Sequence, residues 1–294
     1  MLSSGRRRRP IGLLALALPL AIGSAPAADS SLCQDGFLQI VSPDAQSVSV
    51  GQCTAVEKQT MAAWKYDAEQ MRWADVPGME KPLTMRLLSL ERMKREHPGL
   101  LGFARGRDLF VVSTSVLDDP FANGTLAHEL GHIQAKRALG RFSEAGLVPR
   151  YFIEGHGNSL GRAYRDQLGV ARHDYDVRKA RQIMKFTAEE ARTILTDDSF
   201  GKTDKAEMDR MESMGIFFVE YLRTRCYPGG AANVFAGMAG VFESVGRGKT
   251  YASAFREQFG ATVEQVVSDI VTLVERTASH PAARLKGTHY EEFQ

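Results

Sequence analysis

Hydrophobic positions follow a strand-like pattern only in the first third of the chain and a helical period over most of the remainder. Short apolar or alternating stretches between turn residues predict strands. They are Phe37–Val41, Ser47–Val50, Leu83–Leu90, Leu101–Ala104 and Leu109–Ser113. A turn at Arg105-Gly106-Arg107 predicts that the last two form a hairpin, and Pro43-Asp44 predicts a hairpin of the first two.

Amphipathic stretches with helix start and stop signals predict the remaining elements. Helices are expected over Thr54–Trp73, from Asn123 or Thr125 to Leu139, from Pro149 to about Gln167, from Thr187 onwards, and over Lys205–Arg225, Ala232–Val245, Thr250–Phe259 and Val263–Arg276. Capping boxes introduce two of them, at Thr187 and Thr262. Strands followed by helices predict an α+β fold. We expect one domain over residues 28–280, strand-rich to 118 and helical from 119, with a tail over 281–294.

The first 27 residues are expected to be a secretory signal peptide and not part of the fold. Arg6–Arg9 precede an apolar run, Ile11–Ile22, which is too short to span a bilayer. Ala25 and Ala27 then suit a cleavage site. A twin-arginine signal, a nuclear signal or a nucleic-acid patch are weaker interpretations of the arginines. We therefore predict export to the periplasm or the extracellular space, with no integral membrane segment after cleavage.

Removal of this segment changes the charge and cysteine arguments. The formal net charge of the chain is +2, and loss of the four leader arginines makes it −2, so no nucleic-acid partner is expected. Three cysteines remain, Cys33, Cys53 and Cys226. An oxidising compartment permits a disulfide. Cys33 and Cys53 flank the first predicted hairpin, which favours a disulfide between them. Cys226 would then have no cysteine partner within the chain.

The strongest chemical signal is the sequence His-Glu-Leu-Gly-His at positions 128–132. Residues four apart share one face of a helix, so His128 and His132 can bind the same ion. Glu129 lies beside them, able to take a proton from a water molecule at the metal without being a ligand. Zinc suits this set because it lowers the pKa of its water to about 7. Apolar neighbours at Leu126, Ala127, Leu130 and Ile133 argue against an exposed pair of histidines.

A third ligand is predicted at Glu154, within Tyr151-Phe152-Ile153-Glu154-Gly155. Ala135 and Ala138 exclude the metzincin pattern, which requires Gly and His at these positions. The chain instead resembles the gluzincins, zinc metallopeptidases in which a glutamate on the following helix completes the site, and in particular the bacterial peptidase MA-like group. Looser similarity extends over about residues 100–276. The resemblance implies a zincin-like fold with one zinc ion per chain.

The same resemblance suggests roles around the metal. Asn158 stands where related enzymes have an aspartate that orients a ligand histidine, and its amide oxygen is expected to do the same. Related sequences often carry a tyrosine at the position of Glu212. Charge that develops on the attacked carbonyl still needs a donor, for which His156, Tyr221 and Tyr227 are the candidates.

These residues together predict an exported zinc metallopeptidase acting on a peptide or protein substrate. His128, His132 and Glu154 would hold zinc, and Glu129 would be the general base. Two alternatives remain open. One is hydrolysis of a non-protein amide or ester. The other is an exported zinc-binding or adaptor protein without turnover, which would not require a carboxylate at Glu129.

Overall fold

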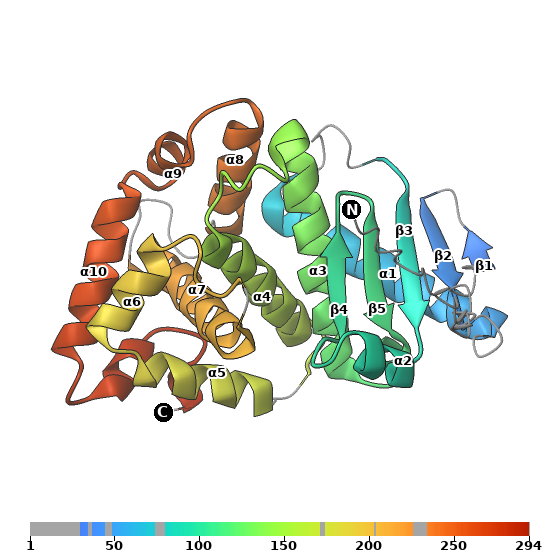
Figure 1. Ribbon diagram of the computed structural model, residues 1–294, viewed down its shortest axis with the longest axis horizontal. Coiled ribbons are helices and arrows are strands. Elements are labelled where there is room, and N and C mark those ends of the chain that lie inside the picture. Colours follow the sequence, from blue (N-terminus) through green and yellow to red (C-terminus); the bar gives the residue numbers. More distant parts are fainter. Residues whose placement is uncertain are drawn as a thin grey trace, which may run out of the picture.

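The structure is a computed structural model that describes residues 30–34, 37–44, 49–73, 80–170, 174–202, 204–225 and 234–293. A mixed β-sheet lies at one end of the molecule, and most of the helices lie at the other (Figure 1). The predicted α+β fold is therefore confirmed. The proposed signal peptide, residues 1–27, lies outside the described residues, as do Cys226 and Tyr227.

The sheet has five strands in the order β1-β2-β3-β5-β4. Their bounds are β1 Ser30–Gln34, β2 Leu38–Ser42, β3 Leu83–Leu88, β4 Gly102–Arg105 and β5 Leu109–Ser113. The β2–β3 and β3–β5 pairs are parallel, and β1–β2 and β4–β5 are antiparallel. The predicted β4–β5 hairpin is confirmed, with Gly102 paired to Val112. This topology leaves β4 at one edge of the sheet, next to the helical region.

The predicted hairpin of Phe37–Val41 with Ser47–Val50 is wrong. β2 pairs with β1 and β3, while Ser49 is the N-cap of helix α1 (Val50–Met71). The Ser49 side chain accepts a hydrogen bond from the backbone N–H of Gln52, and the Gln52 side chain accepts one from the N–H of Ser49. This capping box favours a helix at a position where the local pattern alone suggested a strand. Cys53 is disulfide-bonded; the side chain of Cys33, its expected partner, lies outside the described part of the chain.

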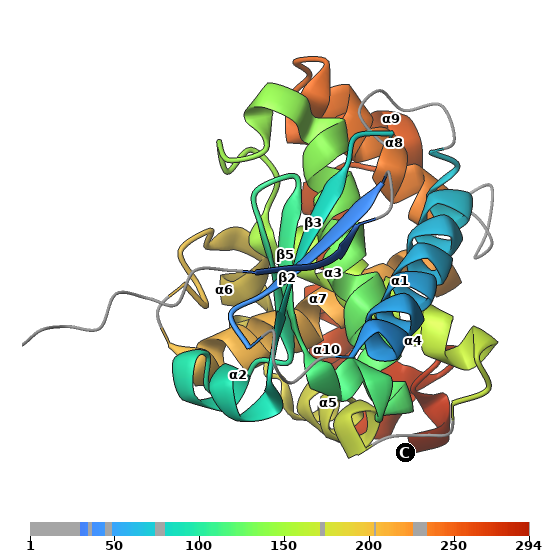
Figure 2. The same cartoon turned by 90° about the vertical axis from the view of Figure 1, so that its right-hand side faces the viewer.

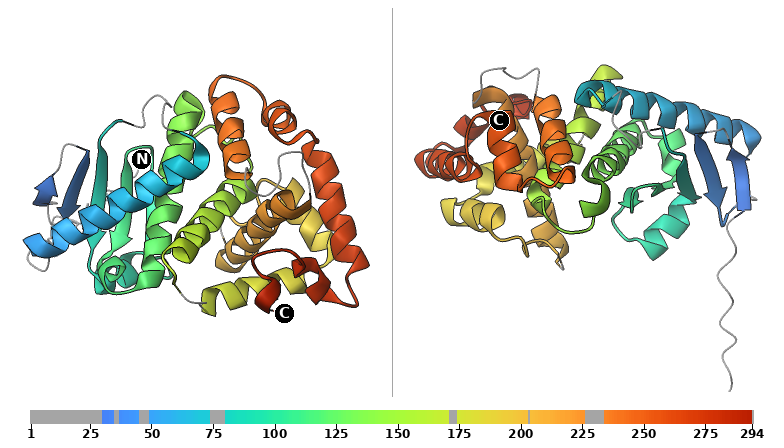
Figure 3. Two further views of the ribbon diagram at one scale, coloured as in Figure 1. Left: turned by 180° about the vertical axis from the view of Figure 1, so that it is seen from behind. Right: turned by 90° about the horizontal axis from the view of Figure 1, so that it is seen from above.

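Helices α1 and α3 (Pro120–Leu139) connect the sheet to the rest of the molecule. α1 crosses one face of the sheet, as the left view of Figure 3 shows, and α3 packs beside it and against β4. A short helix that we did not predict, α2 (Leu90–Glu96), lies on the opposite side (Figure 2). It begins because Ser89 caps it through the N–H of Arg92, which ends the strand at Leu88 instead of the expected Leu90.

The helical region agrees closely with the sequence prediction, except for one helix. Its members are α4 Arg150–Gln167, α5 Asp174–Lys185, α6 Ala188–Thr196, α7 Lys205–Arg225, α8 Val234–Gly246, α9 Tyr251–Phe259 and α10 Val263–Arg276. Both predicted capping boxes are present, at Thr187 and Thr262. The helix that was missed is α5. None of the helices in the described residues is long and apolar enough to cross a membrane.

The C-terminal segment, expected to be a tail, packs against the helices instead. Leu285 and Tyr290 are buried. The guanidinium of Arg284 donates hydrogen bonds to the carbonyls of Ile183, Met184 and Phe186 at the end of α5, and to that of Val274 in α10. These carbonyls have no partner within their own helices, so the segment completes the ends of two helices.

A buried carboxylate fixes the same segment to α7. Glu220 accepts hydrogen bonds from the Arg223 guanidinium at 2.7 Å and from the backbone N–H of His289 at 3.1 Å, and the Nδ1 atom of His289 lies 2.8 Å from its other oxygen. Burial by itself would raise the pKa of Glu220, but the contacts with His289 and Arg223 outweigh it and lower the pKa to about 2. The folded state therefore favours the ionised form.

The first prediction concerns the stability that Glu220 contributes. Because its pKa is lower in the folded state, this contribution is complete above the unfolded pKa and is lost as the pH falls from about 4.5 to about 2, a change of about 3 kcal/mol. Glu220→Gln should lower the free energy of unfolding by about this amount at pH 7 and by little at pH 2.5. Denaturant titrations at both pH values measure the difference.

Glu69→Gln, which removes an exposed ion pair with Lys65, is the matched control and should change stability little at either pH. A pH-independent effect of Glu220→Gln would contradict the assignment.

Candidate metal centre

The centre is built first on α3, which begins a turn earlier than expected. We predicted a start at Asn123 or Thr125, but the N-cap is Asp119, whose side chain accepts a hydrogen bond from the N–H of Phe121. Pro120 is the first residue of the helix, a position where proline is favoured because its missing N–H costs nothing. His128 and His132 are well inside the helix, one turn apart, as predicted.

The second part of the centre, α4, crosses α3 and α7 at unusually short distances. A Cβ atom added to Gly161 of α4 would collide with the backbone carbonyl of Gly124 in α3. One added to Gly155 would collide with the backbone of Gly215 in α7. Only residues without a side chain permit backbones to approach so closely. These crossings bring Glu154 to the histidine face of α3.

The three predicted ligands meet with the spacing of a zinc site. The Nε2 atoms of His128 and His132 are 2.9 Å apart, and Oε2 of Glu154 lies 3.7 Å from the first and 3.4 Å from the second. Ligand atoms about 2.0–2.1 Å from a tetrahedral ion are themselves about 3.3 Å apart. The three atoms therefore match one face of a zinc tetrahedron, and the fourth position is left for water or substrate.

Further observations test whether the surroundings fit a metal. One nitrogen of each histidine and one oxygen of Glu129 lie within 4.8 Å of one another, a group that could hold a metal ion. Gly157 makes room for the rings, because a Cβ there would stand 2.9 Å from Cε1 of His132 and 3.2 Å from Cε1 of His128. Two neutral imidazoles and a carboxylate are a common ligand set for catalytic zinc. The residues present fit a divalent cation.

The charges of the ligands are strongly coupled. Burial lowers the pKa of His128, and the neighbouring His132 lowers it further. Burial would also lower the pKa of His132, but the carboxylate of Glu154 outweighs it and the net shift is upward. The two histidines in turn lower the pKa of Glu154 despite its burial. The shifts favour an ionised Glu154 and a neutral His128, which are the forms in which a carboxylate and an imidazole bind a metal ion.

Glu129 lies beside the three predicted ligands. It is buried, and its Oε1 atom is 3.9 Å from Nε2 of His128. Burial raises the pKa of Glu129 to about 7, although His132 opposes this shift and a hydrogen bond from the backbone N–H of Ala104 opposes it as well. That bond comes from β4, so the edge strand of the sheet fixes the carboxylate.

The residues predicted around the metal are only partly where they were expected. Asn158 lines the same pocket, but its amide group donates to the carbonyl of Glu154 and accepts from the hydroxyl of Tyr175, not from either histidine. Nδ1 of His132 has no hydrogen-bond partner among the described residues. The orienting role expected for Asn158 is therefore not observed, because its side chain turns along α4 and toward α5.

Two of the oxyanion candidates, His156 and Tyr221, do not line the pocket. His156 is fully buried on the other side of α4, where its Nε2 is 3.2 Å from the sulfur of Met71 and its ring packs on Phe242. Tyr221 packs against the hydrophobic core and does not line the pocket. Helical periodicity explains the position of His156. Because it follows Glu154 by two residues, its side chain points about 200° around α4 from that of Glu154.

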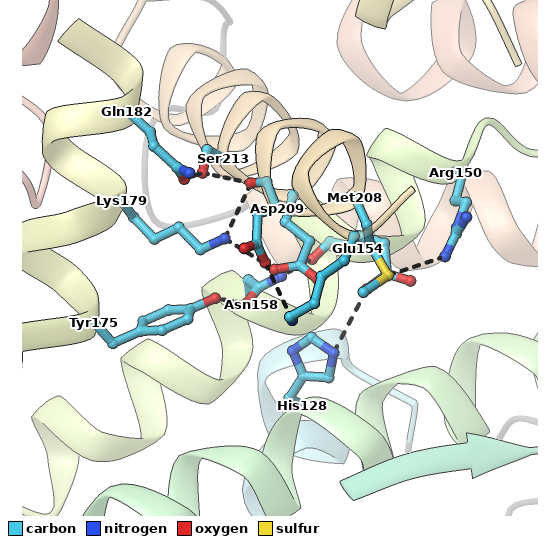
Figure 4. A network of polar contacts seen from close by, with 12 residues as sticks. His128, Arg150, Glu154, Asn158, Tyr175, Lys179, Gln182, Met208, Asp209 and Ser213 are labelled. Atoms are coloured by element: carbon cyan, nitrogen blue, oxygen red, sulfur yellow. Dashed lines mark hydrogen bonds and ion pairs between the residues drawn. The ribbon is translucent and has the colours of Figure 1, made fainter. Parts of the chain in front are cut away.

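A pocket of about 480 Å³ opens from His128 and Glu129. Its walls come from the segment that leads into β4 and from α3, α4, α5 and α7. α5 contributes Tyr175 and carries Lys179, and both side chains point from α5 toward α4 and α7 (Figure 4). Lys179 is 1% exposed, and its ammonium group lies 2.9 Å from the carboxylate of Glu212 in α7. Neither Tyr175 nor Lys179 was expected near the metal centre, because α5 was not predicted from the sequence. Its acidic first turn, Asp174 and Asp176, was an available signal.

Comparison of the chain with protein-family models and with curated proteins finds no match.

The second prediction tests the space that Gly157 leaves for the ligand rings. Gly157→Ala should reduce zinc affinity by at least about tenfold, because the new Cβ must displace both imidazoles. Helix content should be unchanged, since alanine is the better helix former. Gly51→Ala in α1, where only one atom lies within 4 Å of the added Cβ, is the control. Competition with a fluorescent chelator measures zinc affinity. Equal affinities for both variants would show that the space left by Gly157 does not matter for zinc binding.

Proposed function

We propose that the protein is an exported zinc metallopeptidase of the gluzincin type, with His128, His132 and Glu154 as the ligands. The observation that carries the proposal is the meeting of three ligand atoms at 2.9, 3.4 and 3.7 Å from two different helices. Two histidines on one helix face could arise by chance. A carboxylate from a separate helix at ligand distance from both nitrogens is a far more specific arrangement, and it fits one zinc ion per chain.

Glu129 favours a catalyst over a metal carrier. Bound zinc would polarise a substrate carbonyl and lower the pKa of a water molecule in its open position. Glu129 is held at the edge of that position by the N–H of Ala104, and it can take the proton from the attacking water and pass it to the leaving amine. Metal binding alone requires no carboxylate there.

The edge strand β4 favours a peptide substrate. Because the N–H of Ala104 points to Glu129, the backbone groups of β4 on this side face α3 and not β5. Gly102, two residues earlier, has the same orientation and lines the pocket. A peptide main chain lying in the pocket could hydrogen-bond to the backbone of Gly102, where this edge borders the pocket next to His128 and Glu129.

The location we propose is the periplasm or the extracellular space. The leader-like pattern of residues 1–27 and the disulfide at Cys53 support it. A zincin-like arrangement is supported by the position of α3 between the edge strand and α4.

The third prediction concerns the ligand from α4. Glu154→Ala should weaken zinc binding well beyond the roughly 10–100-fold that loss of an outer partner costs, because two imidazoles would be left to hold the ion. The measurement is zinc affinity by chelator competition, with metal content by mass spectrometry. Glu189→Ala, on an exposed part of α6, is the control and should bind zinc like the wild type. Unchanged affinity in Glu154→Ala would rule out the gluzincin assignment.

The fourth prediction separates an enzyme from a binder. Glu129→Gln should keep one zinc per chain and near-wild-type thermal stability, while hydrolysis falls by at least about 10²–10⁴-fold. Glutamine is nearly isosteric but cannot take the proton. The assay is digestion of an unbiased peptide mixture, with a chelator control and restoration by zinc. If the zinc-loaded wild type leaves the mixture intact, the peptidase proposal fails and a non-protein substrate or a non-catalytic role becomes the better explanation.

A further inference from the structure

We infer that Tyr175, in the first turn of α5, donates the hydrogen bond to the oxygen that gains negative charge when a substrate is attacked at this site. Asn158 is the residue that holds its hydroxyl in place. The inference rests on the proposed hydrolytic function. It adds a catalytic residue and a positioning residue from a helix that no sequence pattern connected with the metal.

The site needs a donor that the residues described so far do not supply. Attack on a carbonyl moves charge onto its oxygen, and a preorganised donor at that oxygen is worth about 10²–10³-fold in rate. The proposed ligands supply no donor, because the Nε2 atoms of His128 and His132 and the carboxylate of Glu154 would bind the metal. Glu129 would act on the attacking water. The pocket-lining side chains that carry a donor group are Thr125, Asn158, Arg165, Tyr175, Arg178 and Lys205.

Contacts within the pocket exclude half of these donors. The guanidinium of Arg165 donates to both oxygens of Asp176 at 2.8 and 2.9 Å and is stacked 4.4 Å from the ring of Phe121. The amide N–H of Asn158 is used by the carbonyl of Glu154 at 2.9 Å. Lys205 is an exposed side chain on the rim, near Asp209. Thr125, Tyr175 and Arg178 remain.

Among these three, Tyr175 is the one whose hydroxyl is hydrogen-bonded to α4, the helix that carries Glu154. Its hydroxyl donates to Oδ1 of Asn158 at 2.7 Å, and Asn158 is one turn after Glu154 on α4. Figure 4 shows the phenol pointing from α5 toward Asn158, with Glu154 and His128 beyond it. The hydroxyl is therefore held about one helical turn from a metal ligand, at the wall of the pocket that Glu129 shares.

The ring is held firmly enough to act as a preorganised donor. It packs against Phe121 at 5.6 Å between centroids, and the Lys179 ammonium lies 5.1 Å from the ring centroid. The residues next in the helix fix α5 itself, since Asp176 pairs with Arg165 and Lys179 with Glu212. Tyr175 is thus placed by two buried ion pairs, and not by a flexible loop.

Its chemistry suits the role. Burial raises the pKa of Tyr175 well above its usual value, and the nearby charge of Glu212 raises it further, so the hydroxyl remains a donor throughout the neutral range. The amide oxygen of Asn158 is a neutral acceptor. A charged oxygen accepts a stronger hydrogen bond than a neutral one. When charge develops on the substrate oxygen, the Tyr175 hydroxyl can therefore rotate about its C–O bond and donate to that oxygen instead of to Asn158.

The fifth prediction is that Tyr175→Phe lowers kcat by about 10²–10³-fold while KM, zinc content and melting temperature stay near the wild-type values. Asn158→Ala should lower kcat less, and the double variant should be no slower than Tyr175→Phe alone, because the two residues act as one unit. Tyr164→Phe, which removes a hydroxyl from α4 outside the pocket, is the matched control.

A binding measurement provides a readout that does not depend on turnover. A phosphonate analogue of a cleaved peptide carries a charged tetrahedral centre, and Tyr175→Phe should weaken its binding by the same factor as kcat/KM. An analogue with a reduced, uncharged bond should bind both proteins equally. If the wild type cleaves peptides but Tyr175→Phe is equally fast, or if the loss is found in Thr125→Val or Arg178→Met instead, the inference is wrong and the peptidase proposal stands. If the zinc-loaded wild type cleaves nothing, both fail.

Discussion

The close crossing of α3, α4 and α7 is the constraint on which the rest of the site depends. Gly124 faces Gly161, and Gly155 faces Gly215, at separations that no side chain would allow. This contact lets one carboxylate reach two imidazoles on a neighbouring helix. A wider spacing, such as ordinary 8–10 Å helix packing, would leave Glu154 too far from His128 and His132 for all three to bind one ion.

A second requirement is that the charges concentrated around this contact compensate one another. Glu154, Glu129 and Glu212 bring three carboxylates into a poorly solvated region, where unpaired charges are costly. His132 lies 3.4 Å from the carboxylate of Glu154, and the Lys179 ammonium lies 2.9 Å from that of Glu212. Ion pairs of Asp176 and Lys179 join α5 to the site, and Arg284 of the C-terminal segment completes the end of this helix. The last residues of the chain thus support a pocket wall far away in the sequence.

Local sequence signals were reliable where one short-range interaction determines the structure. Capping boxes at Thr187 and Thr262 and the β4–β5 turn were interpreted correctly, and His128 and His132 lie one turn apart on one helix as predicted. Errors arose where a signal admits two outcomes. Pro120 can break a helix or begin one, and Ser47–Val50 can extend a strand or cap a helix. In both cases the side chain that accepts the backbone N–H of the first turn made the difference.

The sequence by itself determined the helix that carries His128, Glu129 and His132, because the alignment of residues i and i+4 on one face is a property of a single helix. It also indicated Glu154, through the motif around it. Only the tertiary structure decided what surrounds them. It placed the edge strand against Glu129, turned His156 and Tyr221 away from the pocket, directed Asn158 to Tyr175, and brought α5 to the opposite wall. The reason is physical. Helical periodicity fixes the directions of side chains within one element, whereas the distance between two elements depends on the size of the residues at their crossing, which here are glycines.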